Sequence, residues 1–146
     1  MSATIEPGQR LILRTDGASR GNPGPAAAGV IIEREDGRVI ARGGHFLGSM
    51  TNNQAEYRAL ILGLKAIARY APAAVTVRMD SELVVRQMQG RYKVRDDTLR
   101  PLFEEAQTLA RGLPDVRFVH VPRAENHLAD ALANAALDAH KNGLPQ

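Results

Sequence analysis

The sequence contains no cysteine and no tryptophan, and aromatic residues make up only 4% of its 146 positions. Without cysteine the chain can form no disulfide and no thiolate metal site, and it has no cysteine nucleophile, which fits a reducing cytoplasm. No apolar run approaches the length that crosses a membrane. The first residues also lack the charged and then apolar plan of a signal peptide. We therefore expect a cytoplasmic protein that has no membrane partner.

The residues that are present are typical of one soluble globular domain. Hydrophobic residues make up 44% of the chain and charged residues 24%, and 146 residues are enough to bury a sizeable core. Residues 1–9 show no periodicity, so we expect a flexible tail there, followed by a single domain over residues 10–142. The formal net charge of +3 permits a polyanionic partner without requiring one.

The spacing of apolar residues predicts three strands, followed by strands that alternate with helices. The first part consists of strands over 10–16, 26–34 and 38–46, with Asp36-Gly37 as a hairpin turn between the last two. The second part consists of a helix over 53–70, a strand over 74–80, helices over 81–89 and 97–111, a strand over 116–121 and a helix over 125–140. Three antiparallel strands and then two parallel ones predict an α/β fold, a mixed five-stranded sheet with helices on both faces.

Four acidic residues lie near the ends of these predicted elements. Asp16 and Asp80 end the first and fourth strands, and parallel neighbours would bring both carboxylates to one edge of the sheet. Glu56 lies in the first turn of the long helix, toward the side that the helix buries. Asp130 lies in the first turns of the final helix. All four carboxylates are therefore expected to meet at one end of the fold.

Each acid also has a purely structural interpretation. Asp16 could start a tight turn, and Asp80-Ser81 could cap the helix that follows. Glu56 could close a capping box that Asn53 begins, and Asp130 could be a solvated helix charge. Four acids in one place argue against this, because clustered carboxylates repel one another unless a cation joins them. Oxygen ligands without cysteine or paired histidines predict a hard ion such as Mg²⁺ or Mn²⁺.

Four sequence blocks resemble the signature of type 1 ribonuclease H in their order and spacing. The blocks are TDGASRGNPGPAAAG, TNNQAEYRAL, MDSELVVRQM and ENHLADALANAAL, and the resemblance covers residues 10 to about 138. It implies the ribonuclease H-like mixed sheet and metal-dependent cleavage of the RNA strand of RNA–DNA hybrids, with two ions per site. It further implies that the catalytic, metal-coordinating acids are Asp16, Glu56, Asp80 and Asp130.

The resemblance also implies which residues bind the hybrid. The turn at Asn22 and the pair Asn52-Asn53 resemble the family's minor-groove contacts, where amides and backbone groups meet 2′-hydroxyls and base edges. Thr51 resembles a position that contacts a phosphate of the DNA strand. Helix capping is the structural alternative for the asparagines. The expected substrate-binding residues are Gly17, Ser19, Asn22, Thr51, Asn52, Asn53, Ser81, Arg91 and Lys93.

The loop before the last helix departs from many bacterial relatives. They carry a histidine in a flexible loop, which is thought to help product release or proton transfer. Here this loop is shortened to residues 121–126 and has no histidine. Arg123 is the expected catalytic helper near the scissile phosphate, with a plain surface charge as the alternative. His127 belongs to the final helix block, so it is not the equivalent residue.

The segment after Asp80 departs as well, because many relatives insert a Trp- and Lys-rich basic protrusion there. This chain has no tryptophan and only a short segment, in which five basic and two acidic residues give a local charge of +3. These residues are Arg86, Arg91, Lys93, Arg95 and Arg100, with Asp96 and Asp97. They predict a modest basic patch, with a solvated surface as the alternative. The compact form resembles a subgroup of bacterial and archaeal members that lack the protrusion.

Three other functions remain open at this point. They are a DNA nuclease of the same superfamily, a non-catalytic module that binds RNA–DNA hybrids, and a structural or interaction domain. The TNN block and the glycine-rich turn argue against the first, and the presence of all four acids argues against the second. A structural domain would have no reason to gather four acids. We expect a monomeric ribonuclease H with an RNA–DNA hybrid as its partner and no protein partner.

Overall fold

A computed structural model describes residues 6–143, so residues 1–5 of the predicted tail lie outside the described residues. The strands are β1 (Arg10–Ser19), β2 (Gly24–Arg34), β3 (Val39–Met50), β4 (Ala74–Met79) and β5 (Val116–His120). The helices are α1 (Asn52–Ala68), α2 (Glu82–Met88), α3 (Arg100–Arg111), the short 3-10 helix η1 (Arg123–Asn126) and α4 (His127–Lys141). The last residues before β1 pair with the turn after α1, because the Gly8 amide donates to the Ala71 carbonyl and the Ala73 amide to the Gln9 carbonyl, both at 2.9 Å.

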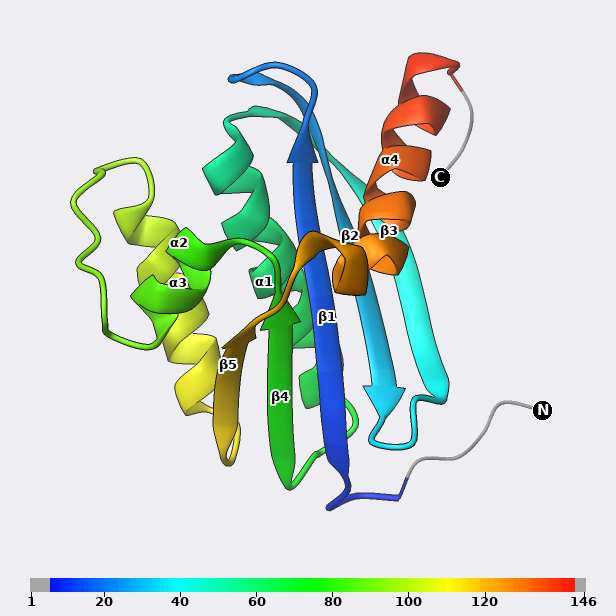
Figure 1. The fold of residues 1–146 in the computed structure, drawn as a ribbon, viewed down its shortest axis with the longest axis vertical. Helices are drawn as coiled ribbons and strands as arrows, with labels where there is room; N and C mark the ends of the chain where they lie inside the picture. The colour runs from blue at the N-terminus through cyan, green and yellow to red at the C-terminus, as the bar shows by residue number, and fades with distance from the viewer. Residues whose placement is uncertain (1–5, 144–146) are drawn as a thin grey trace.

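The strands of the described residues form one mixed sheet in the order β3-β2-β1-β4-β5, as the sequence predicts (Figure 1). The β1–β2 and β2–β3 pairs are antiparallel, and the β1–β4 and β4–β5 pairs are parallel. The predicted hairpin turn is present, with Gly37 in the left-handed region at φ +88°. The parallel pairing brings the carboxyl ends of β1 and β4 to the same edge of the sheet, where open α/β sheets place their sites.

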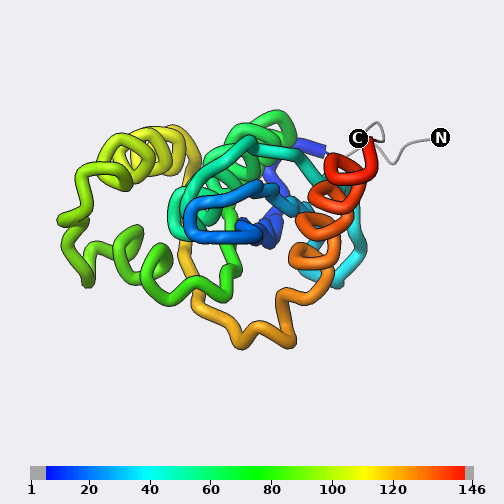
Figure 2. Tube along the Cα trace, turned by 90° about the horizontal axis from the view of Figure 1, so that it is seen from above, coloured from blue at the N-terminus to red at the C-terminus, as the bar shows by residue number. Residues whose placement is uncertain are grey.

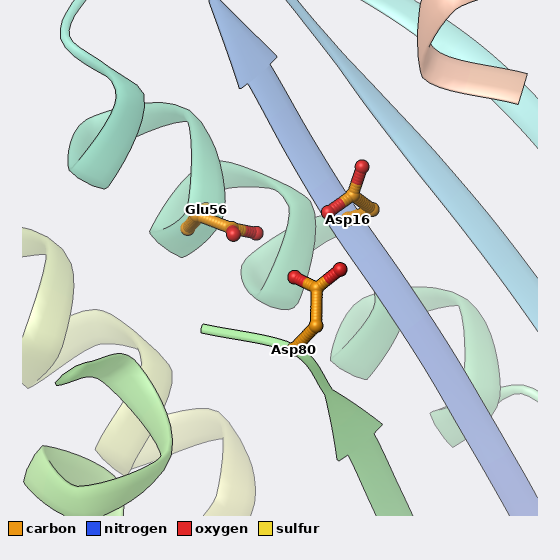
Figure 3. Close-up of side chains that lie close together, drawn as sticks. All are labelled: Asp16, Glu56 and Asp80. Atoms are coloured by element: carbon orange, nitrogen blue, oxygen red, sulfur yellow. The ribbon is translucent and has the colours of Figure 1, made fainter. Parts of the chain in front are cut away.

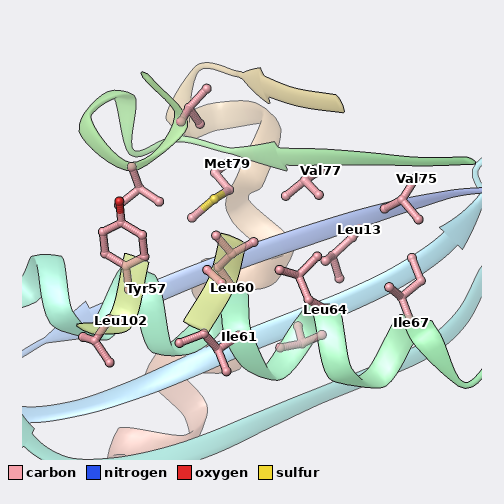
Figure 4. Packing of buried hydrophobic residues seen from close by; sticks show 14 of the residues in the cluster. Leu13, Tyr57, Leu60, Ile61, Leu64, Ile67, Val75, Val77, Met79 and Leu102 are labelled. Atoms are coloured by element: carbon pink, nitrogen blue, oxygen red, sulfur yellow. The ribbon is translucent and has the colours of Figure 1, made fainter. Parts of the chain in front are cut away.

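Helix α1 covers one face of the sheet and forms the main core with it (Figure 4). Its apolar stripe packs against the inward-facing residues of β1 and β4. The side chains of this core that are at most 1% exposed include Leu13, Tyr57, Leu60, Leu64, Ile67, Val75, Val77 and Met79. Since burying one such side chain contributes about 1.5–3 kcal/mol, this packing holds α1, and with it Glu56, firmly against β1.

Helix α4 packs on β2 and β3, and the view from above shows α1 and α4 on different sides of the strands (Figure 2). Two glycines of the sheet allow the close approach that the alanine-rich sequence predicts. A Cβ at Gly29 would lie 1.9 Å from the Ala129 carbonyl oxygen, and one at Gly44 would lie 2.4 Å from that of Leu132. Within residues 6–143, no helix is long and apolar enough to span a membrane.

Two differences from the predicted elements bear on function. β1 continues beyond Asp16 in register with β2, so this residue lies within the strand and not at its end. Helix α3 begins at Arg100 rather than near residue 97. The cause is a local turn, in which the Asp96 carboxylate accepts hydrogen bonds from the amide and the hydroxyl of Thr98 at 2.8 and 2.6 Å. The basic segment before α3 is therefore longer and less regular than predicted.

Candidate active site

Three of the four predicted acids come together at the edge of the sheet where β4 ends (Figure 3). Asp16 lies on β1, Asp80 directly follows β4, and Glu56 lies on α1. One carboxylate oxygen of each lies within 4.8 Å of the other two. Arg14 is opposite Arg78 in the β1–β4 register, so two residues further along Asp16 comes beside Asp80. The predicted parallel pairing thus brings the two aspartates together.

A contact between α1 and β1 orients Glu56. Its Oε1 accepts a hydrogen bond from the Gly17 amide at 2.8 Å, and the residue is only 4% exposed. Glycine is required at position 17, because a Cβ there would lie 2.2 Å from the Ala55 backbone carbonyl. The predicted contact of Gly17 with substrate stays a prediction, since the structure explains this glycine by packing alone.

Asp130 borders this cluster from α4. It is half-buried and does not belong to the three acids whose oxygens lie within 4.8 Å of one another. Its Oδ1 accepts a hydrogen bond from the Asn134 amide group at 3.2 Å, one helical turn further on. A hydrogen bond with Asp130 also contributes to the raised pKa of Asp16, after burial and the charges of the two nearer acids. Asp130 therefore lies beside the cluster, and its role as a metal ligand stays a prediction.

Burying these like charges perturbs their titration strongly. Burial, followed by the charges of Glu56 and Asp80, raises the pKa of Asp16 to about 9. Burial also raises the pKa of Glu56 to about 8, although the hydrogen bond from Gly17 lowers it. The pKa of Asp80 is raised by burial as well, against the charge of Arg123. The cluster is therefore electrostatically unfavourable when all of its carboxylates are ionised.

The arrangement fits a divalent cation. All donor atoms are carboxylate oxygens, the ligands that hard cations prefer. Two oxygens bound to one Mg²⁺ at 2.0–2.1 Å lie at most about 4.2 Å apart, which is comparable with the observed spread of up to 4.8 Å. A cation would also offset the repulsion that raises these pKa values, in competition with protons. Three of the four predicted acids therefore form a group that could hold a divalent cation.

Arg123 is an exposed basic residue near the cluster. It lies in η1, is exposed, and makes no ion pair or hydrogen bond through its side chain among the described residues. Its charge is nevertheless close enough to lower the pKa values of Glu56 and Asp80, both of which burial raises. Arg123 therefore lies near the acids, as expected. Its catalytic role stays a prediction.

A histidine that the sequence analysis did not single out also lies beside the site. His120 ends β5 opposite Met79, so it comes next to Asp80, whose burial-raised pKa its charge lowers. The parallel pairing of the last two strands was the signal that could have identified it. His127 is placed differently, because its Nδ1 lies 2.9 Å from the Ala124 carbonyl oxygen within the preceding turn.

The residues predicted to read the minor groove lie together at the start of α1. The Asn22 Oδ1 accepts a hydrogen bond from the Asn52 amide at 3.1 Å, and Asn52 and Asn53 are exposed. Asn22 thus performs the capping role considered as its alternative, yet its side-chain amide donors remain available. The Thr51 hydroxyl accepts a hydrogen bond from the Gln54 amide at 3.2 Å. Its own proton remains available for a phosphate oxygen.

The capping alternatives for two of the acids are wrong. The capping box of α1 joins Thr51 and Gln54, rather than Asn53 and Glu56. Helix α2 is capped by Ser81 and not by Asp80, because the Ser81 hydroxyl accepts from the Val84 amide at 3.3 Å. Neither the Glu56 nor the Asp80 carboxylate is therefore used to cap a helix.

Ser19 and Ser81 both have structural roles. The Ser19 hydroxyl lies 2.9 Å from the Met50 carbonyl oxygen, to which it donates, and it also lies close to the Gly21 carbonyl. Ser81 caps α2, as described above. The predicted substrate contacts of both serines stay predictions.

The basic segment, residues 86–100, runs from the end of α2 to the first residue of α3, on the side of the sheet away from α4 (Figure 1). Its outer residues, Arg86 and Arg100, donate hydrogen bonds to oxygens of their own segment. Its inner residues Arg91, Lys93 and Arg95 are exposed, and the structure gives their side chains no partner among the described residues. Three positive charges, rather than five, are therefore available to a polyanion.

Comparisons with known proteins show what the whole chain is similar to. A family model described as reverse transcriptase-like matches residues 14–136. The chain is 46% identical to ribonuclease HI of Halobacterium salinarum over 140 residues, 94% of this chain and 70% of that protein. It is 44% identical to bifunctional protein Rv2228c of Mycobacterium tuberculosis over 131 residues, 89% of this chain but only 36% of that protein. The crystal structure of LC11-RNase H1 in complex with an RNA/DNA hybrid matches with a TM-score of 0.86 at 44% identity, covering 89% of this chain and 98% of that chain.

Proposed function

The chain belongs to the type 1 ribonuclease H family, and on this premise we propose that it is an endonuclease that hydrolyses the RNA strand of RNA–DNA hybrids with divalent metal ions. The observation that carries the proposal is the cluster of Asp16, Glu56 and Asp80, of which the first two are buried and whose carboxylate oxygens lie within 4.8 Å of one another. Gathering like charges away from water opposes folding. The cluster is therefore explained by metal binding and catalysis and not by a contribution to stability. A similar protein was solved with an RNA/DNA hybrid, which supports the same substrate here.

The cofactor that we propose is Mg²⁺ or Mn²⁺, with two ions per site held by Asp16, Glu56, Asp80 and Asp130. When bound, such a pair of ions supplies Lewis-acid stabilisation of the reacting phosphate and lowers the pKa of water for an in-line displacement. The chain itself contributes hydrogen bonds that orient the carboxylates. The Gly17 amide orients Glu56, and the Asn134 side chain orients Asp130.

Recognition of the hybrid is assigned to the start of α1 and the neighbouring turn. Asn22, Asn52 and Asn53 present amide groups that can hydrogen-bond to 2′-hydroxyls and base edges, which distinguishes RNA from DNA. The Thr51 hydroxyl, whose oxygen caps α1, donates its proton to a phosphate of the DNA strand. These contacts would set the duplex so that its RNA strand crosses the carboxylates.

Two groups of basic residues are given different tasks. Arg123, next to the acids, stabilises the charge that develops on the scissile phosphate. Arg91 and Lys93 lie in the basic segment, away from the acids, and contact phosphates that do not react. The first group therefore affects the rate of the chemical step, and the second affects binding in the ground state and the transition state equally.

We further infer that the protein acts as a monomer in the cytoplasm. All four acids come from one chain, so the site needs no second copy. The chain has no cysteine, which fits a reducing compartment. Light scattering at the assay concentration tests the monomer, with a dimer mass as the contradicting result.

A cleavage assay tests the proposed function. One sequence is prepared as an RNA–DNA hybrid, a DNA duplex and an RNA duplex, each end-labelled, and incubated with Mg²⁺, Mn²⁺ or EDTA. We expect cleavage within the RNA strand of the hybrid, only when a divalent ion is present. Equal cleavage of the DNA duplex would support a DNA nuclease instead. Hybrid binding without any cleavage would support a non-catalytic module.

A further inference from the structure

The turn that carries Arg123 is held in place from β1. This turn consists of Pro122 and η1, and it joins β5 to α4. Among the described residues the Arg123 side chain has no partner that would fix it, so the position of its charge depends on the backbone of the turn. What holds this backbone therefore decides where the charge lies relative to the carboxylates.

Two side-chain contacts join the turn to adjacent residues of β1. Arg14 Nη1 donates to the Glu125 carbonyl oxygen at 2.9 Å. The side-chain amide of Asn126, which is 1% exposed, donates to the Thr15 carbonyl oxygen at 2.9 Å. The same strand carries Asp16, the next residue after these contacts. The turn is thus positioned relative to the strand that supplies a central carboxylate.

Arg14 is itself fixed by an ion pair on the same face of the sheet. Its Nε bonds to a carboxylate oxygen of Glu33 on β2, whose side chain is 9% exposed. The planar guanidinium thereby uses one edge for Glu33 and another nitrogen for the Glu125 carbonyl. A lysine could pair with Glu33, but it lacks the fork that reaches both oxygens in fixed directions. Arg14 therefore connects the sheet to the turn.

We propose that Arg14 is a positioning residue for cleavage, which holds Arg123 over the carboxylates through the Glu125 carbonyl. This inference rests on the proposed role of Arg123 at the scissile phosphate. Its physical basis is that a charge stabilises a transition state best when its position needs no reorganisation at the moment of reaction. Arg14 therefore affects kcat from β1, two residues before Asp16, without touching the substrate.

The test uses a pair of variants that differ in whether the turn keeps its anchor. In the double variant Arg14→Leu with Glu33→Leu, the anchor is lost and no unpaired buried charge remains, which keeps folding nearly unaffected. In the control Glu33→Gln, a neutral acceptor replaces the carboxylate, and Arg14 can still donate to the Glu125 carbonyl. We expect kcat to fall at least three-fold in the double variant and to stay within two-fold in the control, with KM within two-fold in both.

A double-mutant cycle separates positioning from general damage. In an Arg123→Ala background the Leu pair should cause no further loss of kcat, because no charge remains to be positioned. Hydrogen exchange of the peptide over residues 121–127 should also be faster in the Leu pair than in Glu33→Gln. If the Leu pair melts below the assay temperature, Arg14→Lys replaces it, and the same loss of kcat is expected.

An equal loss of kcat in both backgrounds, or none in the Leu pair, overturns the proposal. An Arg123→Ala variant with the wild-type rate overturns it too, since there is then no charge to hold. In each of these cases cleavage by the wild-type chain leaves the proposed ribonuclease activity standing. A wild-type chain that cleaves no hybrid removes the activity and the positioning role together.

Discussion

The four acids, here termed the carboxylate corner, and the basic segment carry opposite charges in opposite settings. Asp16 and Glu56 are 5% and 4% exposed, and they lie on β1 and α1, which share the main core. Arg91 and Lys93 are exposed on a stretch that belongs to neither a helix nor a strand. The two central acids of the corner are therefore held by the core and poorly solvated, while the basic segment is surrounded by water.

This difference determines what each region can contribute. Electrostatic interactions are strong where water is excluded, and salt and solvent weaken them at the surface. Charges in the corner can therefore change the energy of a transition state by several kcal/mol, whereas charges in the basic segment mainly attract the duplex. The expected division is that the corner sets the rate and the basic segment sets the affinity.

The largest effect is expected in the corner itself. Asp16→Asn or Asp80→Asn should lower kcat by about a thousand-fold or more, the scale on which an essential catalytic group acts. Asp138→Asn, which changes a 62% exposed carboxylate on α4, is the matched control and should retain activity. Hybrid cleavage with Mg²⁺ and with Mn²⁺ measures both. An active Asp16→Asn protein would contradict the metal site.

The next effect concerns Arg123, which lies at the border of the corner. Removing a preorganised donor lowers kcat by about 10²–10³-fold at buried sites. Because Arg123 is exposed, we expect Arg123→Ala to lower kcat by about 10- to 100-fold, with KM nearly unchanged. Steady-state kinetics on one hybrid separates the two constants. A raised KM with unchanged kcat would assign Arg123 to substrate binding, together with the basic segment.

Reversing charge in the basic segment should have a smaller effect, and it should change KM rather than kcat. Arg91→Glu with Lys93→Glu should raise KM several-fold and leave kcat nearly unchanged, because these residues meet the duplex equally in the ground and transition states. The same reversal at two exposed positions elsewhere, Arg111→Glu with Lys141→Glu, controls for net charge. An equal rise of KM in the control would show that only total charge matters.

The smallest effect concerns pH and the stability of the metal-free protein. In the folded protein the pKa is about 9 for Asp16 and about 8 for Glu56, against ordinary values of 3.8 and 4.5. Between about pH 4 and 9 the folded state therefore binds more protons than the unfolded chain, so the free energy of unfolding falls as the pH rises. The thermal midpoint in EDTA should decrease from pH 5 to pH 9. A midpoint that increases over this range would show that the corner carries no raised pKa.

The sheet and the meeting of the acids could be predicted because local patterns encode them. Alternating apolar residues mark the strands, and the parallel placement of two of them brings Asp16 and Asp80 together. The α1 cap could not be assigned in the same way, since Thr51, Asn53, Gln54 and Glu56 offer two overlapping capping boxes. Only the contact of Glu56 with Gly17, 39 residues away, decides between them.

The anchors of the Arg123 turn were not predicted at all. Arg14 and Glu125 are 111 residues apart, as are Thr15 and Asn126. In both pairs one partner is a backbone carbonyl, which every residue has. A side chain that bonds to a distant backbone group leaves no pattern in the sequence. Such contacts become visible only when the fold brings the segments together.

The most direct test of the carboxylate corner compares wild type with Asp16→Asn in the absence and presence of metal. The wild-type corner holds repelling carboxylates until a cation joins them, so the variant should melt higher than wild type in EDTA. Adding Mg²⁺ or Mn²⁺ should then raise the wild-type midpoint, because a ligand at a hundred times its Kd stabilises the folded state by about 2.7 kcal/mol. The same addition should raise the midpoint of Asp16→Asn far less. If the variant instead melts lower in EDTA and gains as much from metal as wild type does, Asp16 is a structural residue and the corner is not a metal site.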